Sequence, residues 1–183
     1  MTPFEQTLLE VDRICRESQT PYAVIGGIAA LVHGGMRTTQ DVDITIYTEI
    51  GQLARIYKLF EKDFAAIRQD AMAFFERFFV LSLRHGQSEI RVDIAAALSG
   101  LERDAIKRSE RRLFGAVEIN VCTIEDLLIF KLFAAREKDL LDVKSLVAHN
   151  REKLDLAYLR ARAKDFVLLE RNDVLERLEA LLR

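Results

Sequence analysis

Three aspartates, Asp41, Asp43 and Asp93, are the residues of this 183-residue chain whose types and spacing point most directly to chemistry. The first two alternate in the segment DVDITIY (residues 41–47), and the third lies in EIRVDIA (residues 89–95). Aspartate is a poor strand former, and like charges side by side in a sheet repel one another. Something other than strand stability must favour these acids.

Both segments alternate apolar and polar residues, which is typical of a strand with one buried face. Successive side chains of a strand point to opposite faces, so Asp41 and Asp43 share one face while Val42 and Ile44 share the other. Asp93 has the same phase in its own strand. If the two strands are neighbours, the three carboxylates converge.

Three carboxylates this close could not all stay ionised without a strong positive partner, because each raises the pKa of the others. A divalent cation supplies that charge. Oxygen ligands without a cysteine or histidine cluster favour Mg²⁺ or Mn²⁺ over zinc, and bound Mg²⁺ commonly keeps waters and substrate phosphates as ligands. The expected partner is therefore a nucleoside triphosphate. The alternative is that each aspartate is an ordinary solvent-facing acid.

A glycine pair, Gly26 and Gly27, follows the apolar stretch at residues 22–25. A strand that turns into a helix at two glycines presents backbone N–H groups at the positive end of the helix, where phosphate oxygens can approach closely. By itself the pair favours a plain, tight strand-to-helix turn. Combined with the acids downstream, it predicts a phosphate-binding turn.

Further candidates for phosphate binding lie before and after the acids. Arg37 and Thr39 precede the first acidic strand, where a guanidinium can pair with phosphate oxygens, although an exposed loop arginine is the alternative. Lys131 lies on an apolar helical stripe and needs a partner, which is either the triphosphate or an acid of the core. Asp139 shares a helix face with Asp142, and by position alone this pair fits a solvated first helical turn, where acids are favoured.

The elements that must position these residues follow from the apolar periodicity. Helices are expected over residues 2–17, 27–33, 50–61 and from 123 onward. Strands are expected over residues 22–26 and 41–47, on both sides of a turn at 85–88, and within 112–122. The sequence therefore predicts an α+β fold, a small mixed β-sheet with helices on one face and a helical C-terminal part. Residues 1–121 are the expected core, and residues 122–183 the helical part that closes the nucleotide cleft.

Composition adds limits rather than a function. A formal net charge of −2 and a pI near 6.0 give no general attraction to nucleic acid or acidic membranes, so such binding needs a local patch. The run KRSERR at residues 107–112 is the candidate, and its ordinary interpretation is a solvated helix end. Cys15 and Cys122 suggest neither a zinc site nor a disulfide framework. The longest apolar stretch, residues 22–32, is too short to span a bilayer, so a cytoplasmic protein without a membrane partner is expected.

The glycine pair, the run RTTQDVD at residues 37–43 and the later strand aspartate, Asp93, resemble the nucleotidyltransferase fold shared with DNA polymerase beta. The segment KLFAAREKDLLDV at residues 131–143 is similar to the lysine and aspartate motifs of the AbiEii-like nucleotidyltransferases, the toxins of type IV toxin–antitoxin systems. The resemblance spans residues 22 to about 147. It has one departure, because most of the superfamily has Gly-Ser where this chain has Gly27, which leaves backbone donors to bind phosphate.

The resemblance implies an enzyme that moves a nucleoside monophosphate from a nucleoside triphosphate to an acceptor hydroxyl and releases pyrophosphate. Asp41 and Asp43 would bind two Mg²⁺ or Mn²⁺ ions at the α-phosphorus. Asp93 would complete the metal site on the acceptor side and help take the hydroxyl proton. The implied nucleotide-binding residues are Gly26, Gly27, Arg37, Thr39, Lys131 and Asp139.

The toxin likeness implies an RNA acceptor, particularly a tRNA end, and a cognate antitoxin protein as partner. A protein side chain and an aminoglycoside-like small molecule are competing acceptors. A catalytically silent nucleotide- or partner-binding module with the same fold is the alternative that Gly27 raises.

Overall fold

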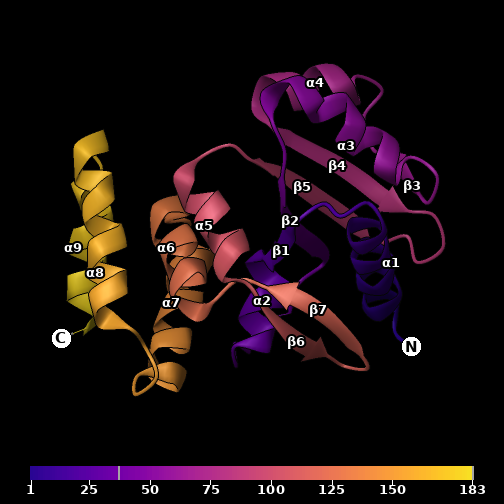
Figure 1. The fold of residues 1–183 in the computed structure, drawn as a ribbon. Helices are drawn as coiled ribbons and strands as arrows, with labels where there is room; N and C mark the ends of the chain where they lie inside the picture. The colour runs from indigo at the N-terminus through magenta and orange to yellow at the C-terminus, as the bar shows by residue number, and fades with distance from the viewer. Residues whose placement is uncertain (37, 183) are drawn as a thin grey trace. The chain divides into compact units, whose positions relative to one another are not determined.

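The computed structural model describes residues 1–36 and 38–182, and the chain forms two compact units (Figure 1). The first unit comprises Met1–Ala29 and Thr38–Cys122, and the second Ala30–Arg37 and Thr123–Arg183. The sheet belongs to the first unit, whereas the second is helical. Among the described residues, no helix combines the length and the apolar character that a bilayer crossing needs.

The elements of the first unit are, in chain order, α1 Pro3–Glu17, β1 Tyr22–Ile25, α2 Gly26–Val32, β2 Asp41–Tyr47, η1 Ile50–Gln52, α3 Leu53–Phe60, β3 Phe64–Ala66, α4 Ala71–Phe78, β4 Val80–His85, β5 Arg91–Ala97, α5 Gly100–Arg108, β6 Glu110–Phe114 and β7 Val117–Val121, of which α2 continues into the second unit. The second unit goes on with α6 Ile124–Ala134, α7 Glu137–Asn150, α8 Leu156–Asp165, η2 Phe166–Leu169 and α9 Asn172–Leu182.

Within the described residues, seven strands form one sheet in the order β3-β4-β5-β2-β1-β7-β6. The pairs β2–β5 and β1–β7 are parallel and the others antiparallel, so the expected mixed α+β architecture is confirmed. The predicted strand at 41–47 matches β2 residue for residue.

The register of β2 against β5 is fixed by their apolar face. Val42 lies opposite Val92 and Ile44 opposite Ile94, and all four side chains are fully buried. A slip by one residue would turn this face to solvent and bury the acids, which makes the observed register strongly preferred. The acidic face of the two strands is therefore positioned by the apolar face behind it.

Three elements were not expected from the sequence: β3, α4 and α5. α5 is highly charged and buries only Ala105 and Ile106 among its residues, so its apolar period is weak. Its start signal is a capping box, in which Ser99 and Glu102 each accept a backbone N–H of the other. The basic run at 107–112 is a helix end only in part, because β6 begins at Glu110 and carries the last two arginines.

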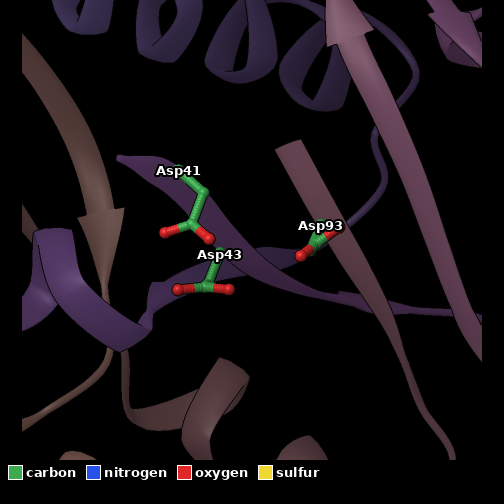
Figure 2. Close-up of side chains that lie close together, drawn as sticks. All are labelled: Asp41, Asp43 and Asp93. Carbon is green, nitrogen blue, oxygen red and sulfur yellow. The ribbon is translucent and has the colours of Figure 1, made fainter. Parts of the chain in front are cut away.

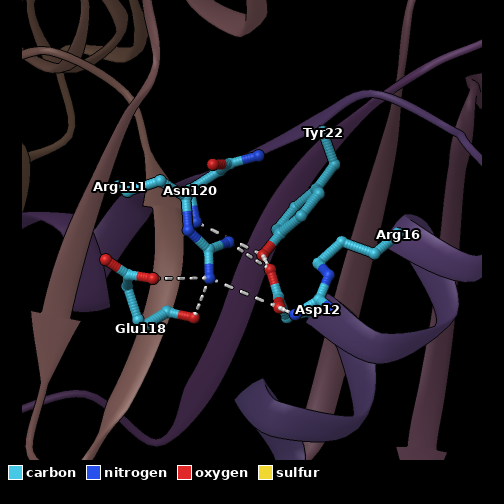
Figure 3. A network of polar contacts seen from close by, with 6 residues as sticks. All are labelled: Asp12, Arg16, Tyr22, Arg111, Glu118 and Asn120. Carbon is cyan, nitrogen blue, oxygen red and sulfur yellow. Dashed lines mark hydrogen bonds and ion pairs between the residues drawn. The ribbon is translucent and has the colours of Figure 1, made fainter.

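A buried polar network ties α1 to the sheet (Figure 3). The Tyr22 hydroxyl donates to Asp12 Oδ1 at 2.7 Å and accepts from the backbone N–H of Asn120 at 3.3 Å. Arg111 of β6 also donates to Asp12 and, at 2.6 Å, to the carbonyl of Glu118. Burial, together with the hydrogen bond to Asp12, raises the pKa of the Tyr22 phenol above its usual range. The network therefore holds the β6–β7 hairpin against α1 and β1.

In the second unit, α6 begins with a side-chain cap at Thr123, where the helical stretch was expected to start. The backbone N–H of Asp126 donates to Thr123 Oγ1 at 3.3 Å, and the Thr123 hydroxyl in turn donates to the Asp126 carboxylate at 2.8 Å. The Tyr158 hydroxyl of α8 donates to the other Asp126 oxygen at 2.5 Å. This acid thus fixes both the start of α6 and the position of α8 beside it.

Candidate active site

Asp41, Asp43 and Asp93 converge on the polar face of β2 and β5 (Figure 2). Asp43 lies directly opposite Asp93 in the parallel register, and Asp41 is two residues earlier on β2. One ligand oxygen from each carboxylate lies within 4.8 Å of the others, and all three side chains are half-buried. Among the described residues this is the one cluster with the geometry to hold a metal ion.

Hydroxyl donors hold the outer two carboxylates. Thr39 Oγ1 donates to Asp41 Oδ1 at 3.0 Å, and Ser82 Oγ of β4 donates to Asp93 Oδ1 at 2.6 Å. Each bond limits the rotation of a carboxylate that faces the cluster. The site therefore presents oriented oxygens rather than freely rotating acids.

Arg91 forms a two-point contact with Asp93. Its Nε donates to Oδ1 at 3.0 Å, and its terminal Nη2 lies 2.8 Å from Oδ2. The hydrogen bond to Asp93 raises the pKa of the Arg91 guanidinium, as do the charges of Asp41 and Asp43, while partial desolvation opposes this. The charges of all three acids therefore act on the Arg91 guanidinium.

The donor set fits a hard divalent cation. Each acid offers a carboxylate oxygen, the ligand atom that Mg²⁺ and Mn²⁺ prefer, and half-exposure leaves room for waters or substrate phosphates as further ligands. Cys15 and Cys122, the softer ligands, are buried and lie outside the cluster. Burial raises the pKa of the Cys15 thiol above its usual range, which disfavours the thiolate.

The glycine pair lies against the acidic strand. Gly26 has a left-handed φ of +64°, and a Cβ at this position would lie 2.0 Å from Asp43 Oδ2. A Cβ at Gly27 would lie 2.5 Å from Thr39 Oγ1. Any side chain at these positions would collide with a residue of the cluster or with its support. The space beside Gly27 is thus occupied by the side chain of Thr39, whose hydroxyl binds Asp41.

Lys131 and Asp139 belong to the second unit, where Lys131 pairs with acids. Its Nζ lies 2.7 Å from Asp142 Oδ2 and 3.5 Å from Asp139 Oδ1. Arg136 also donates to Asp139, at 2.5 Å. Of the two partners considered for Lys131, the structure contains the core acid. The interpretation of Asp139 and Asp142 as a solvated first turn is wrong, because both are buried.

Sequence reasoning missed Ser82 and Arg91 as members of the site. Arg91 has the same strand phase as Asp93, a signal that was available two residues away. Ser82 reaches Asp93 only through the antiparallel register of β4 with β5, which no local pattern specifies. Arg37, the remaining predicted phosphate ligand, lies outside the described residues.

Comparison with known proteins identifies a family. Residues 5–178 match the model of the family described as "Nucleotidyltransferase of unknown function (DUF6036)". No curated protein matches the chain.

Several solved structures resemble the chain. ANT(2")-Ia in complex with adenylyl-2"-tobramycin has a TM-score of 0.62 at 12% identity, and the match covers 88% of this chain and 99% of that one. An antigenic nucleotidyltransferase-like protein from Paracoccidioides brasiliensis has a TM-score of 0.54 at 17% identity, covering 96% and 92%. The lincosamide antibiotic adenylyltransferase LnuA, lincomycin-bound, has a TM-score of 0.51 at 15% identity, covering 78% and 95%. At these identities the likeness shows the nucleotidyltransferase fold.

Proposed function

Because this chain belongs to the nucleotidyltransferase family of unknown function DUF6036, we propose that its acidic cluster transfers a nucleoside monophosphate from a nucleoside triphosphate to an acceptor hydroxyl. The observation that carries the proposal is the convergence of Asp41, Asp43 and Asp93 from two neighbouring strands. Half-buried acids that repel one another are destabilising in an apo protein, so their retention in register is accounted for by a cationic ligand.

In this proposal each residue has a distinct task. Mg²⁺ or Mn²⁺ bound by the three carboxylates supplies charge neutralisation at the phosphates and a lower pKa for the acceptor hydroxyl. Asp41 is held in its binding orientation by Thr39, and Asp43 lies against Gly26. Asp93 faces the acceptor and takes the hydroxyl proton, and pyrophosphate leaves as the new phosphodiester forms.

The glycine turn handles the phosphates through its backbone. Without side chains, Gly26 and Gly27 leave their N–H groups open to close approach by phosphate oxygens. Lys131 lies in the helical part of the chain, residues 122–183. The ion pairs of Lys131 with Asp139 and Asp142 stabilise that part. A phosphate contact from Lys131 would have to compete with them.

We favour a small hydroxyl-bearing molecule over RNA as the acceptor. The observation is that three residues of the basic run at 107–112 pair with acids. Lys107 pairs with Asp104, Arg112 with Glu110, and Arg111 with Asp12 and Glu118. A patch engaged in this way offers little free charge to a phosphate backbone. ANT(2")-Ia and LnuA, which share the fold, carry a modified or bound antibiotic.

The decisive experiment measures transfer directly. The purified protein is incubated with each α-labelled nucleoside triphosphate, Mg²⁺, and either an aminoglycoside and lincosamide panel or total RNA. We expect label on a small molecule and pyrophosphate release, both lost on Asp43→Asn. Asp70→Asn, the same change at an exposed carboxylate of the same unit, is the matched control and should retain activity. Transfer that survives Asp43→Asn in a folded protein would rule the proposed site out.

The same assay separates the alternatives. Label on a tRNA end would support the toxin-like function, which further requires that expression slows growth and that a neighbouring gene product, the antitoxin, relieves it. Tight nucleotide binding without transfer to any acceptor would instead support the catalytically silent module.

A further inference from the structure

We propose that Arg91 competes with the divalent cation for Asp93, so that Asp93 becomes a metal ligand only when the guanidinium moves away. The inference rests on the proposed function, since it concerns the same acidic cluster. It assigns Arg91 a positioning role: the residue holds Asp93 in place before the metal arrives and sets how tightly the cluster binds the metal.

The geometry of the pair motivates the proposal. Arg91 contacts both oxygens of Asp93, at 3.0 and 2.8 Å, and Ser82 adds a third contact at 2.6 Å. A guanidinium that contacts both oxygens in this way occupies the positions from which a cation would bind the carboxylate. By contrast, the hydrogen bond that the structure records on the Asp41 carboxylate comes from the neutral hydroxyl of Thr39. Of these two acids, Asp93 is therefore the one with a positively charged partner that competes with a cation.

The charges of the cluster strengthen the argument. The guanidinium cancels one of the three negative charges, and its own pKa is raised by its contact with Asp93 and by the charges of Asp41 and Asp43. Without the guanidinium, all three acids would be available to a divalent cation. The more negative local charge and the freed oxygens of Asp93 would both favour binding of the cation.

Exposure allows the exchange to occur. The Arg91 side chain is 49% exposed, whereas that of Asp93 is 20% exposed. A half-exposed ion pair is weak because water competes for both groups, and the long arginine side chain can swing into solvent without opening the core. Arg91 therefore lowers metal affinity without blocking the site.

The test measures Mn²⁺ binding without nucleotide, by calorimetry and by electron paramagnetic resonance. We expect Arg91→Gln to tighten the dissociation constant about twofold to fivefold, the range of one half-exposed ion pair. Arg91→Lys keeps the charge but loses the fork, and should fall between the wild type and Arg91→Gln. Ser82→Ala, which removes a neutral donor from the same carboxylate, is the matched control and should change the constant less than Arg91→Gln.

A double-mutant cycle localises the effect. In the Asp93→Asn background, Arg91→Gln should alter Mn²⁺ affinity less than in the wild type. Without the Asp93 carboxylate, Arg91 and the cation no longer compete for the same group. Weaker or unchanged binding by Arg91→Gln, or an equal effect in both backgrounds, would overturn the inference.

Failure of the inference and of the proposed function are distinguishable. If Mn²⁺ binding is lost on Asp43→Asn but insensitive to Arg91, only the role of Arg91 is refuted. If Mn²⁺ does not bind, or binds equally to Asp43→Asn, the metal site itself is refuted, and the inference with it.

Discussion

The acidic face of β2 and β5 and the α6–α7 pair contain similar side chains in opposite settings. In the first, three half-buried carboxylates lie together, and the half-exposed guanidinium of Arg91 pairs with one of them, Asp93. In the second, Asp139 and Asp142 are buried and face the two cations Lys131 and Arg136. The first cluster has excess negative charge within reach of solvent, whereas the second is balanced and closed. Charge balance and access, rather than the presence of acids, distinguish a metal-binding arrangement from a structural one.

The difference predicts opposite responses to mutation. Neutralising a member of the balanced cluster leaves a buried charge without its partner, which is costly. Neutralising a member of the open cluster relieves repulsion. Neutralisation should therefore lower the stability of the second unit. In the first unit it should leave stability unchanged or higher and weaken metal binding.

The largest effect is expected from Lys131→Met. The substitution keeps the length of the side chain but leaves Asp142 buried with its main cationic partner removed, so the free energy of unfolding should fall by about 3–5 kcal/mol. Urea unfolding followed by circular dichroism measures it. Arg136→Gln, which removes a cation that is 63% exposed, is the control and should cost less. Equal stability of Lys131→Met and the wild type would show that the ion pair of Lys131 with Asp142 does not stabilise the fold.

The next effect concerns the glycine turn beside the open cluster. Gly26→Ala places a methyl group against Asp43 at a left-handed φ, so we expect a loss of about 1–3 kcal/mol together with impaired metal binding. Gly100→Ala adds its Cβ to open space at the start of α5 and should be neutral or slightly stabilising. Similar behaviour of the two variants would argue against the close packing of Gly26 on Asp43.

Acid should weaken the balanced cluster. Burial alone would raise the pKa of Asp139, but the hydrogen bond from Arg136 and the charge of Lys131 outweigh it, and the net pKa is lowered. A carboxyl with a lowered folded pKa stabilises the fold above its unfolded pKa, about 3.9, and this contribution is lost as the pH falls through the folded value. Unfolding free energies between pH 5 and pH 2.5 should decline less steeply in Arg136→Gln; parallel curves would contradict the assignment.

The smallest effect is expected in the open cluster without metal. Asp41→Asn removes a like charge and should change stability by no more than about 1 kcal/mol, in the stabilising direction. Added Mn²⁺ should raise the melting temperature of the wild type, because it binds only the folded state, but raise that of Asp41→Asn less. The two melting curves with and without Mn²⁺ provide the check, and equal shifts would exclude Asp41 as a ligand.

The position of each acid on the polar face of its own strand was predictable because it depends on period two and on a buried apolar face, both of which are local properties of DVDITIY and EIRVDIA. The strand at β2 was predictable for the same reason, and the helix that starts after residue 123 was predictable from its apolar periodicity. The pairing of β2 with β5 was assumed rather than derived, since strand order depends on contacts between residues far apart in sequence.

The contacts that could not be predicted mostly join residues that are far apart in the sequence. Ser82 reaches the site through strand register, and Arg111 leaves the basic run to pair with Asp12, 99 residues away. The partner of Lys131 was an open choice because a helical stripe shows that a cation is buried but not which acid meets it. α5 was overlooked although its Ser99–Glu102 box was visible, because charge obscured its apolar period.

The Figure 3 network has a consequence for biosynthesis. During translation the residues from Asp41 to Asp93 are synthesised before Arg111 and Asn120, so Asp12 and Tyr22 acquire these partners only after the rest of the site has been made. Contacts of such long separation form late and slow folding. A nascent chain halted before β6 would contain all three proposed metal ligands while one side of β1 remained an open edge, prone to pair with other strands.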